Sequence, residues 1–171
     1  MKKEITIKNL EFNPFEEIKN SWCLVSSKNE EGIGLMTASW GSVGTIWGQD
    51  SFTVYIRPTR QTYEFITKNE NFTISFFKPE DKEILKYCGV KSGRDVNKLK
   101  ECNLSVQDID THHIFNEARL SFNCKKVYMQ QMDLDLLVNE KEKVMKYYDN
   151  NPDGVHILFI GFVEHIYSNE E

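Results

Sequence analysis

The chain has 171 residues, of which 40% are hydrophobic and 27% charged, and its formal net charge is −5. This balance is typical of a globular protein with a full core, and it argues against a general nucleic-acid binder, which would show a basic face or a high pI. No apolar run approaches the length that crosses a bilayer, and the first residues lack the apolar region of a signal peptide, so we expect a cytoplasmic protein with no membrane partner.

The four cysteines form no C-x-x-C pair, and their spacings match no zinc signature. We therefore expect free thiols in a reducing compartment and no metal site. No repeat, low-complexity tract or Pro/Ser-rich linker interrupts the sequence, so we predict one domain over residues 1–171.

The first half of the chain is predicted to be mainly β. Residues 1–13 are typical of an arm or an edge strand, and Asn13 followed by Pro14 predicts a capped short helix. A glycine-punctuated loop that contains Trp47 precedes a stretch of strict apolar–polar alternation. Strands are predicted over residues 22–27, 32–39, 51–56 and 72–76, and a helix over residues 60–68 with Thr59 as N-cap.

The second half is predicted to add short helices and two long strands. Pro79 and an acidic first turn indicate a helix over residues 79–87, with Gly89 just past its end. The remaining predicted elements are helices over residues 96–101 and 141–148, a turn over residues 150–154, and strands over residues 119–130 and 156–167.

These elements amount to six or seven strands and three or four short helices. Most strands are not separated by full-length helices, so parallel βαβ winding is not expected. The sequence therefore predicts a mainly β protein, an antiparallel barrel with helices packed on its outside.

A doubly basic turn joins a predicted strand to a predicted helix at residues 56–62. Arg57, Pro58 and Arg60 stand there beside hydroxyl residues, including Thr62. A helix start leaves backbone N–H groups unpaired and carries partial positive charge, which suits a phosphate group. Two solvated surface arginines are the alternative interpretation.

Small and aromatic residues end the second predicted strand. Thr37 and Ser39 lie two apart and face the same way on a strand, while Ala38 keeps the backbone approachable for a flat heteroaromatic ring. The alternative is a strand end with a buried Trp40, and this tryptophan and Trp47 would then be core or subunit-interface residues.

A third candidate segment, Lys91 to Asp95, follows one predicted helix and precedes another. Gly93 permits an unusual backbone angle, and Arg94 offers a directed cation. A solvated loop is the alternative. The adjacent His112 and His113 would point to opposite faces of a strand and do not form a metal pair.

Taken in order, these segments resemble the flavin reductase-like family of FMN-binding split barrels, which includes flavoredoxin. The resemblance spans roughly residues 20–165 and rests on residues 36–41 (MTASWG), 46–48 (IWG), 55–65 (YIRPTRQTYEF), 88–98 (CGVKSGRDVNK), 117–118 (EA) and 156–161 (HILFIG). One departure is Gln61, where the family pattern leads us to expect an aromatic residue.

The resemblance implies an FMN-binding split β-barrel of Greek-key type, and a homodimer with FMN at or near the subunit interface. By this analogy Thr37, Ala38, Ser39 and Trp40 line the isoalloxazine ring. The residues that would hold the phosphate and the ribityl chain are Arg57, Arg60, Gln61 and Thr62. Those that would approach the flavin or its substrate are Ser92, Gly93, Arg94 and Lys98. The predicted cofactor-binding set also includes Met36 and Pro58.

The predicted function is FMN-dependent redox chemistry, as a flavin reductase that oxidises NAD(P)H or as a flavoredoxin-like electron carrier served by a redox partner protein. The alternative is a non-catalytic dimeric binding protein for FMN or another planar phosphorylated ligand. Simple hydride transfer needs no side-chain acid or base, so no catalytic residue is predicted. No G-x-G-x-x-G motif is present, so no separate Rossmann domain is expected to bind the nucleotide.

Overall fold

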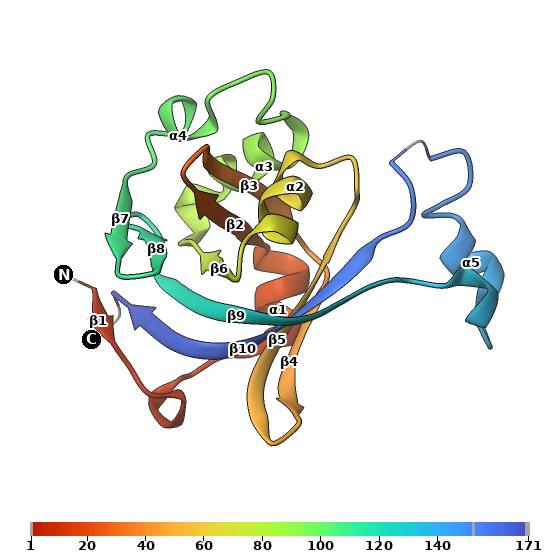
Figure 1. Ribbon diagram of the computed structural model, residues 1–171, viewed down its shortest axis with the longest axis horizontal. Helices are drawn as coiled ribbons and strands as arrows, with labels where there is room; N and C mark the ends of the chain where they lie inside the picture. The colour runs from red at the N-terminus through yellow and green to blue at the C-terminus, as the bar shows by residue number, and fades with distance from the viewer. Residues whose placement is uncertain (1, 152, 170–171) are drawn as a thin grey trace.

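A curled antiparallel sheet dominates the computed structural model, which describes residues 2–151 and 153–169 (Figure 1). Within these residues eight strands form one sheet in the order β3-β2-β6-β9-β10-β5-β4, with β1 paired to the end of β10. The strands are β1 (Lys3–Glu4), β2 (Cys23–Asn29), β3 (Gly32–Ala38), β4 (Gly41–Ile46), β5 (Gln49–Ile56), β6 (Asn71–Phe76), β9 (Leu120–Gln131) and β10 (Ile157–Ser168). A separate hairpin consists of β7 (Val106–Ile109) and β8 (His112–Phe115).

Short helices connect or cover the strands. The α-helices are α1 (Pro14–Glu16), α2 (Gln61–Lys68), α3 (Lys82–Val90), α4 (Lys98–Glu101) and α5 (Lys141–Met145). The 3₁₀-helices are η1 (Ile7–Asn9), η3 (Pro79–Asp81) and η4 (Leu134–Leu136), and η2 (Glu17–Ser21) is a π-helix. None of the helices in the described part of the chain is long and apolar enough to cross a membrane.

The core lies inside the curl of the sheet. Alternate residues of β5, beginning with Phe52, are fully buried, as the period of two predicted. Phe52, Phe76 and Phe122 meet edge to face or tilted, with ring centroids 5.5–6.4 Å apart. The bulges that shift the register between β9 and β10 bend this long ribbon and help the sheet to curl.

A second apolar layer lies between the strands β2 and β3 and the helices α3 and α4. Leu24 and Leu35 point out of the sheet and pack with Leu85 and Cys88 of α3. Figure 1 shows α2, α3 and α4 gathered around the β2–β3 end of the sheet, while the segment between β9 and β10 that carries α5 extends away from the body. The helices are therefore peripheral, as predicted.

Several predicted elements are confirmed. Asn13 caps α1 by accepting a hydrogen bond from the Phe15 N–H at 3.2 Å, and Pro14 is the first helical residue. The predicted edge strand in residues 1–13 is β1, which pairs with β10 alone.

The glycine-punctuated segment before β5 is a strand and not the predicted loop. β4 and β5 form a hairpin whose two-residue turn is Trp47-Gly48, with φ of +51° and +71°. Two positive φ values match the twist of a tight hairpin. Glycine at the second position supplies one of them without strain.

Several predicted helix ends were wrong. The helix predicted from residue 96 begins at Lys98, and the helix predicted to end at residue 148 ends at Met145. The N-cap position of α2 is Arg60, and the Thr59 hydroxyl instead donates to Asp153 at 3.1 Å. Gly89 lies inside α3, which continues to Val90. A Cβ on Gly89 would stand 3.4 Å from the Thr37 Cβ, so this glycine allows α3 to pack closely on β3.

Candidate functional site

A cationic cavity of about 260 Å³ lies at the start of α2. It brings together the end of β3, the first turn of α2, the loop after α3 and the start of α4. Eight of its lining residues belong to the predicted cofactor-binding set, namely Met36, Arg60, Gln61, Thr62, Ser92, Gly93, Arg94 and Lys98. Thr59, Lys91 and Asp153 complete the wall.

The first turn of α2 forms one side of the cavity. Arg60 occupies the N-cap position with extended backbone angles, and its side chain does not cap the helix. Its guanidinium donates to the Gly89 carbonyl at 3.2 Å, which holds it against α3. Because a helix start carries partial positive charge, Arg60 adds to a field that already favours an anion.

The loop from Lys91 to Asp95 forms the opposite side. The Ser92 hydroxyl accepts a hydrogen bond from the Arg94 N–H at 3.2 Å, which shapes the turn. The Arg94 guanidinium reaches across to α2, donating to the Thr59 carbonyl at 2.8 Å and to the Glu64 carboxylate at 2.5 Å. That hydrogen bond, with the charge of Arg94, lowers the pKa of Glu64.

Gly93 brings this loop close to α2. A Cβ at Gly93 would collide with the side-chain oxygen of Gln61, so only glycine fits against the present Gln61 conformation. The departure at Gln61 and the glycine of the loop are thus neighbours in space. In this structure the end of the Gln61 side chain occupies the space beside Gly93.

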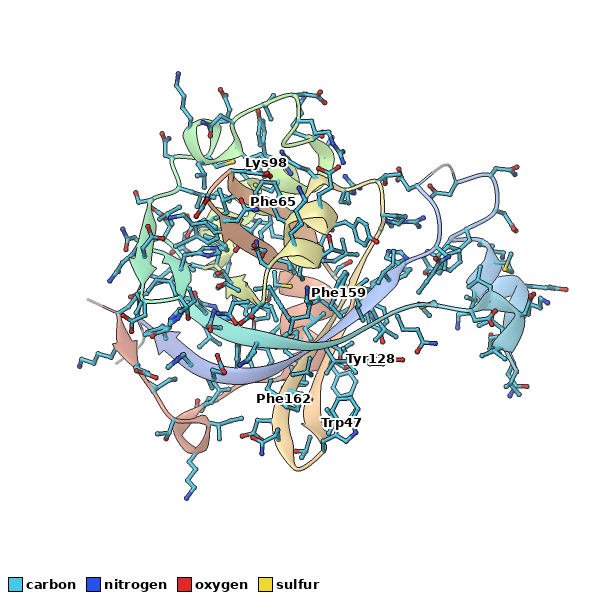
Figure 2. All side chains as sticks on the ribbon, in the orientation of Figure 1. Trp47, Phe65, Lys98, Tyr128, Phe159 and Phe162 are labelled. Atoms are coloured by element: carbon cyan, nitrogen blue, oxygen red, sulfur yellow. The ribbon has the colours of Figure 1, made fainter. Side chains whose placement is uncertain are left out.

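Lys98 supplies a buried cation. It is 6% exposed, and its ammonium donates to the carbonyls of Leu35 at 2.8 Å and Cys88 at 2.9 Å. Burial lowers its pKa. Figure 2 shows Lys98 near Phe65 of α2, and both side chains line a second cavity of about 480 Å³.

The two cavities lie next to each other and have part of their walls in common. They share Gln61, Gly93, Arg94 and Lys98, and the larger one runs along β3 to the hairpin at Gly32. We refer to the two adjoining cavities together as the groove. The cationic cavity has four cationic side chains in its wall, those of Arg60, Lys91, Arg94 and Lys98.

The predicted ring-lining residues at the end of β3 face different parts of the structure. Met36 faces the cationic cavity, whereas the Thr37 hydroxyl points the other way and donates to the Leu85 carbonyl at 2.5 Å. Ala38 is buried in the core. Ser39 and Trp40 lie past the strand end and line a separate cavity of about 580 Å³ between α1 and the α5 segment.

Arg57 does not line the cationic cavity. Its guanidinium donates to the carbonyls of Gly154 at 2.7 Å and Tyr147 at 2.8 Å, and it lies 5.4 Å from the centre of the Tyr148 ring. Pro58, the next residue, lies against Gly154. In this structure Arg57 therefore holds the α5 segment to the end of β5.

An aromatic cluster stands beside Arg57. The His156 ring lies 4.5 Å from the Trp40 ring, and its Nδ1 is 3.1 Å from the Tyr148 hydroxyl. Tyr147 packs edge to face on Trp40 at 5.1 Å. Burial, with the charges of Arg57 and Arg60, lowers the pKa of His156 to about 4, so this imidazole is neutral near neutral pH.

Sequence reasoning missed Asp153 as a wall residue of the cationic cavity and the two tyrosines beside Trp40. Asp153 reaches the cavity through its contact with Thr59, 94 positions away in the chain. Nothing local in the sequence signals such a contact. Tyr147 and Tyr148 fell in a predicted helix, where an aromatic pair has no distinctive spacing.

The geometry suits a flat ligand that carries an anion. Arginine and lysine donors with a helix start can hold a phosphate group. The aromatic cluster and the strand end beyond Met36 provide apolar surface nearby. No group of acidic, histidine or cysteine side chains in residues 2–151 and 153–169 is arranged to hold a metal ion.

The curled sheet with peripheral helices and a groove beside its edge places the chain among the split-barrel proteins. The family model for the flavin reductase like domain matches residues 15–171, and the chain belongs to that family. A search of curated proteins found no match.

Three solved structures illustrate the shared fold. An FMN-binding domain of a flavin reductases-like enzyme from Shewanella baltica is 17% identical, with a TM-score of 0.69 over 99% of this chain and 78% of that one. A flavoredoxin from Methanosarcina acetivorans is 20% identical, with a TM-score of 0.67 over 88% of this chain and 69% of that one. A Shewanella frigidimarina protein described with a split barrel domain is 19% identical, with a TM-score of 0.66 over 88% and 68% of the two chains.

These comparisons confirm the predicted family and the predicted mainly β, antiparallel split barrel. They support a flavin-related function.

Proposed function

We propose that this protein binds FMN, with the phosphate in the cationic cavity at the start of α2, and that it is an FMN-dependent oxidoreductase. The observation that carries the proposal is the meeting of Arg60, the first turn of α2, the Ser92–Arg94 loop and Lys98 around one cavity. Membership of the flavin reductase-like family supplies the ligand class.

The residues of the cavity fit a phosphate ester. Arg60 and Lys98 bind the adjacent α3 carbonyls of Gly89 and Cys88, and Thr62 lies in the same wall with the helix N–H groups. Asp153 is an acid in the same wall, and its oxygen is already engaged by Thr59. Cations exceed acids in this wall, so the balance favours an anion.

A passage for a thin chain away from the phosphate opens beside Gly93 when the flexible Gln61 side chain turns aside. Gly93 has no side chain, and the Gln61 side-chain oxygen lies 2.0 Å from where a Cβ at position 93 would stand. We assign the ribityl chain to this passage. The isoalloxazine ring is assigned to the end of the strand beyond Ala38, where Ser39 and Trp40 line a cavity of their own.

Bound FMN supplies hydride or single-electron transfer. The protein's residues bind and orient it, and no side chain acts as acid or base in this scheme. NADH, NADPH or a reduced redox protein is the proposed donor. His156 is neutral near neutral pH and lies beside Trp40, so it adds polarity without a competing positive charge near the ring.

A homodimer is part of the proposal. Trp47 is 63% exposed at the tip of the β4–β5 hairpin, and it contacts Tyr128 and Phe162 with ring centroids 6.4 and 6.2 Å away (Figure 2). Tyr128 of β9 is 40% exposed, and it lies on the same side of the sheet as its partner Ile160 and as Phe162. An aromatic face of this kind is typical of a subunit interface.

We further place the protein in the cytoplasm. The four cysteines are free thiols, which suits a reducing compartment.

The absorbance spectrum of the purified protein, mixed with FMN and freed of unbound flavin, tests the function. A flavin spectrum bleached by NADH or NADPH alone identifies a reductase. Bleaching only by dithionite or by a reduced partner protein identifies an electron carrier, and a tightly held flavin that no donor reduces indicates a binding protein. Failure to retain any flavin contradicts the proposal.

A further inference from the structure

Two free thiols face each other beneath the cationic cavity. The Sγ atoms of Cys88, on α3, and Cys102, just past α4, are 3.9 Å apart and share a weak hydrogen bond. Cys88 is fully buried, whereas Cys102 is partly exposed. The two sulfurs lie in the apolar layer between the helices and the sheet.

The two cysteines bracket the loop that lines the cavity. They are 14 positions apart, and Ser92, Gly93, Arg94 and Lys98 all lie between them. A disulfide needs an S–S distance of about 2.05 Å, so the sulfurs must approach by roughly 1.9 Å. Cys102 directly follows α4, whose Lys98 ammonium donates to the Cys88 carbonyl, so the two segments already lie against each other.

We propose that Cys88 and Cys102 form a reversible disulfide that closes the loop carrying Ser92, Gly93, Arg94 and Lys98. The bond is a modification of this loop, and it does not depend on the proposed flavin function. Its oxidant is a low-molecular-weight disulfide, which is a common form of oxidising stress on protein thiols.

The exchange proceeds in two balanced steps. The exposed Cys102, as a thiolate, attacks the small disulfide, forms a mixed disulfide and releases one small thiolate, which takes up a proton. Cys88, as a thiolate, then attacks the Cys102 sulfur, forms the protein disulfide and releases the second small thiolate, which is also protonated. The two protein thiols are oxidised, and one small disulfide is reduced to two small thiols.

The surroundings of the thiols make this exchange slow at neutral pH. Burial raises the pKa of Cys102, and it raises the pKa of Cys88 to about 12. The ionisable groups that act on the pair are Lys98, which lowers both values, and Glu101, which raises that of Cys102. Tyr87 also lies near the pair, since both thiols raise its pKa. Because the thiolate is the reacting form and the pKa of each thiol is raised, the exchange should accelerate as the pH rises.

The other two thiols are internal controls. Cys23 is 1% exposed and points its thiol at the Ala38 carbonyl, and Cys124 is fully buried in the core. Neither thiol is accessible to a small disulfide while the protein is folded. A native protein treated with oxidant should therefore react at Cys102 first and at Cys88 second.

Peptide mapping by mass spectrometry, after treatment with oxidised glutathione at mildly alkaline pH and without reductant, tests the pairing. We expect one intramolecular link between Cys88 and Cys102, reversed by dithiothreitol, with Cys23 and Cys124 unmodified. Cys88→Ser should stop at a glutathione adduct on Cys102, and Cys102→Ser should leave Cys88 unmodified.

A glutathione adduct that persists on Cys102 of the wild-type protein overturns the proposal, and so does a link that involves another cysteine. Tryptic cleavage after Lys91 and Arg94 gives a second readout, because both residues are exposed in the loop. We expect cleavage to slow at least about threefold in the disulfide form, since closure restricts the opening that a protease needs. Equal cleavage rates in the two forms contradict the closure.

Discussion

Arg57 and Arg60 stand at the same strand-to-helix turn, yet their guanidinium groups have different partners. Arg57 is engaged by two carbonyls of the α5 segment, and Arg60 is engaged by one carbonyl at the wall of the cationic cavity. Arg60 is thus the arginine of the pair that lines the proposed phosphate site.

Arg60→Ala is expected to weaken FMN binding by about 10- to 100-fold, because a hydrogen bond to a charged group contributes about 1.5–3 kcal/mol. A titration of flavin fluorescence measures the change. Lys68→Ala is the matched control, since Lys68 lies at the far end of α2 and pairs only with Glu31 on the surface in the contacts described. Arg57→Ala should weaken binding less than Arg60→Ala does, and unchanged affinity in Arg60→Ala contradicts the phosphate assignment.

Gly161 marks a close approach in the core. A Cβ there would stand 2.6 Å from the Phe72 ring and 2.7 Å from the Cys124 Cβ, where neither neighbour can yield freely. Gly161→Ala should therefore lower the free energy of unfolding by about 1–3 kcal/mol through overpacking. Denaturant unfolding measures the loss.

Gly44→Ala is the control for this substitution. Gly44 also lies in a strand, but a Cβ there meets no atom within 4 Å. Its stability should stay within about 0.5 kcal/mol of the wild-type value. Equal effects at the two glycines would show that the contact with Phe72 is not what requires glycine at position 161.

At the scale of elements, the β7–β8 hairpin covers polar residues on the outer face of the sheet. His113 of β8 is 3% exposed, and its Nε2 lies 2.8 Å from the Ser26 hydroxyl. Burial lowers the pKa of His113 to about 4, below the value of about 6.5 expected in the unfolded chain. The unfolded state therefore binds a proton first as the pH falls.

This difference predicts an acid-sensitive hairpin. The stability that neutral His113 contributes is present above about pH 6.5 and is lost as the pH falls toward about 4, with about 2 kcal/mol lost by about pH 5. His113→Gln keeps a polar side chain but does not titrate. Unfolding free energies at about pH 7 and pH 5 should fall less in this variant than in the wild type, and parallel losses would contradict the assignment.

Among the helices and strands, those with a local sequence signal could be predicted and others could not. Alternation found β5 and β6, and Asn13-Pro14 found the start of α1, because these signals are local. The β4 strand was missed because its glycines read as loop punctuation, although Trp47-Gly48 forms the tight turn of a hairpin. The short β7–β8 hairpin was also not predicted.

The candidate site could likewise be predicted only where its residues are close together in the sequence. Residues near in sequence, such as Arg60, Gln61 and Thr62, could be grouped from the motif alone. The side-chain direction of Arg57 could not be predicted, because it is set by carbonyls about 90 positions away. The role of Asp153 depends on a contact of similar range, so only the fold reveals it.

At the scale of the whole molecule, the aromatic face around Trp47 should hold two copies together. Trp47→Asp combined with Tyr128→Ser is expected to shift the protein from dimer to monomer in sedimentation equilibrium, because a buried charge would oppose association. Val90→Asp is the control, since Val90 is 80% exposed at the end of α3, outside this face. A wild-type monomer, or a double variant that remains dimeric, contradicts the proposed interface.

The central claim is that the cationic cavity holds the phosphate of FMN. Parallel equilibrium titrations of the protein with FMN and with riboflavin, which has the same ring but no phosphate, test it most directly. We predict that FMN binds at least about tenfold more tightly, since the phosphate gains charge-assisted hydrogen bonds that riboflavin lacks. Equal affinities for the two flavins, or no binding of FMN, would contradict the account.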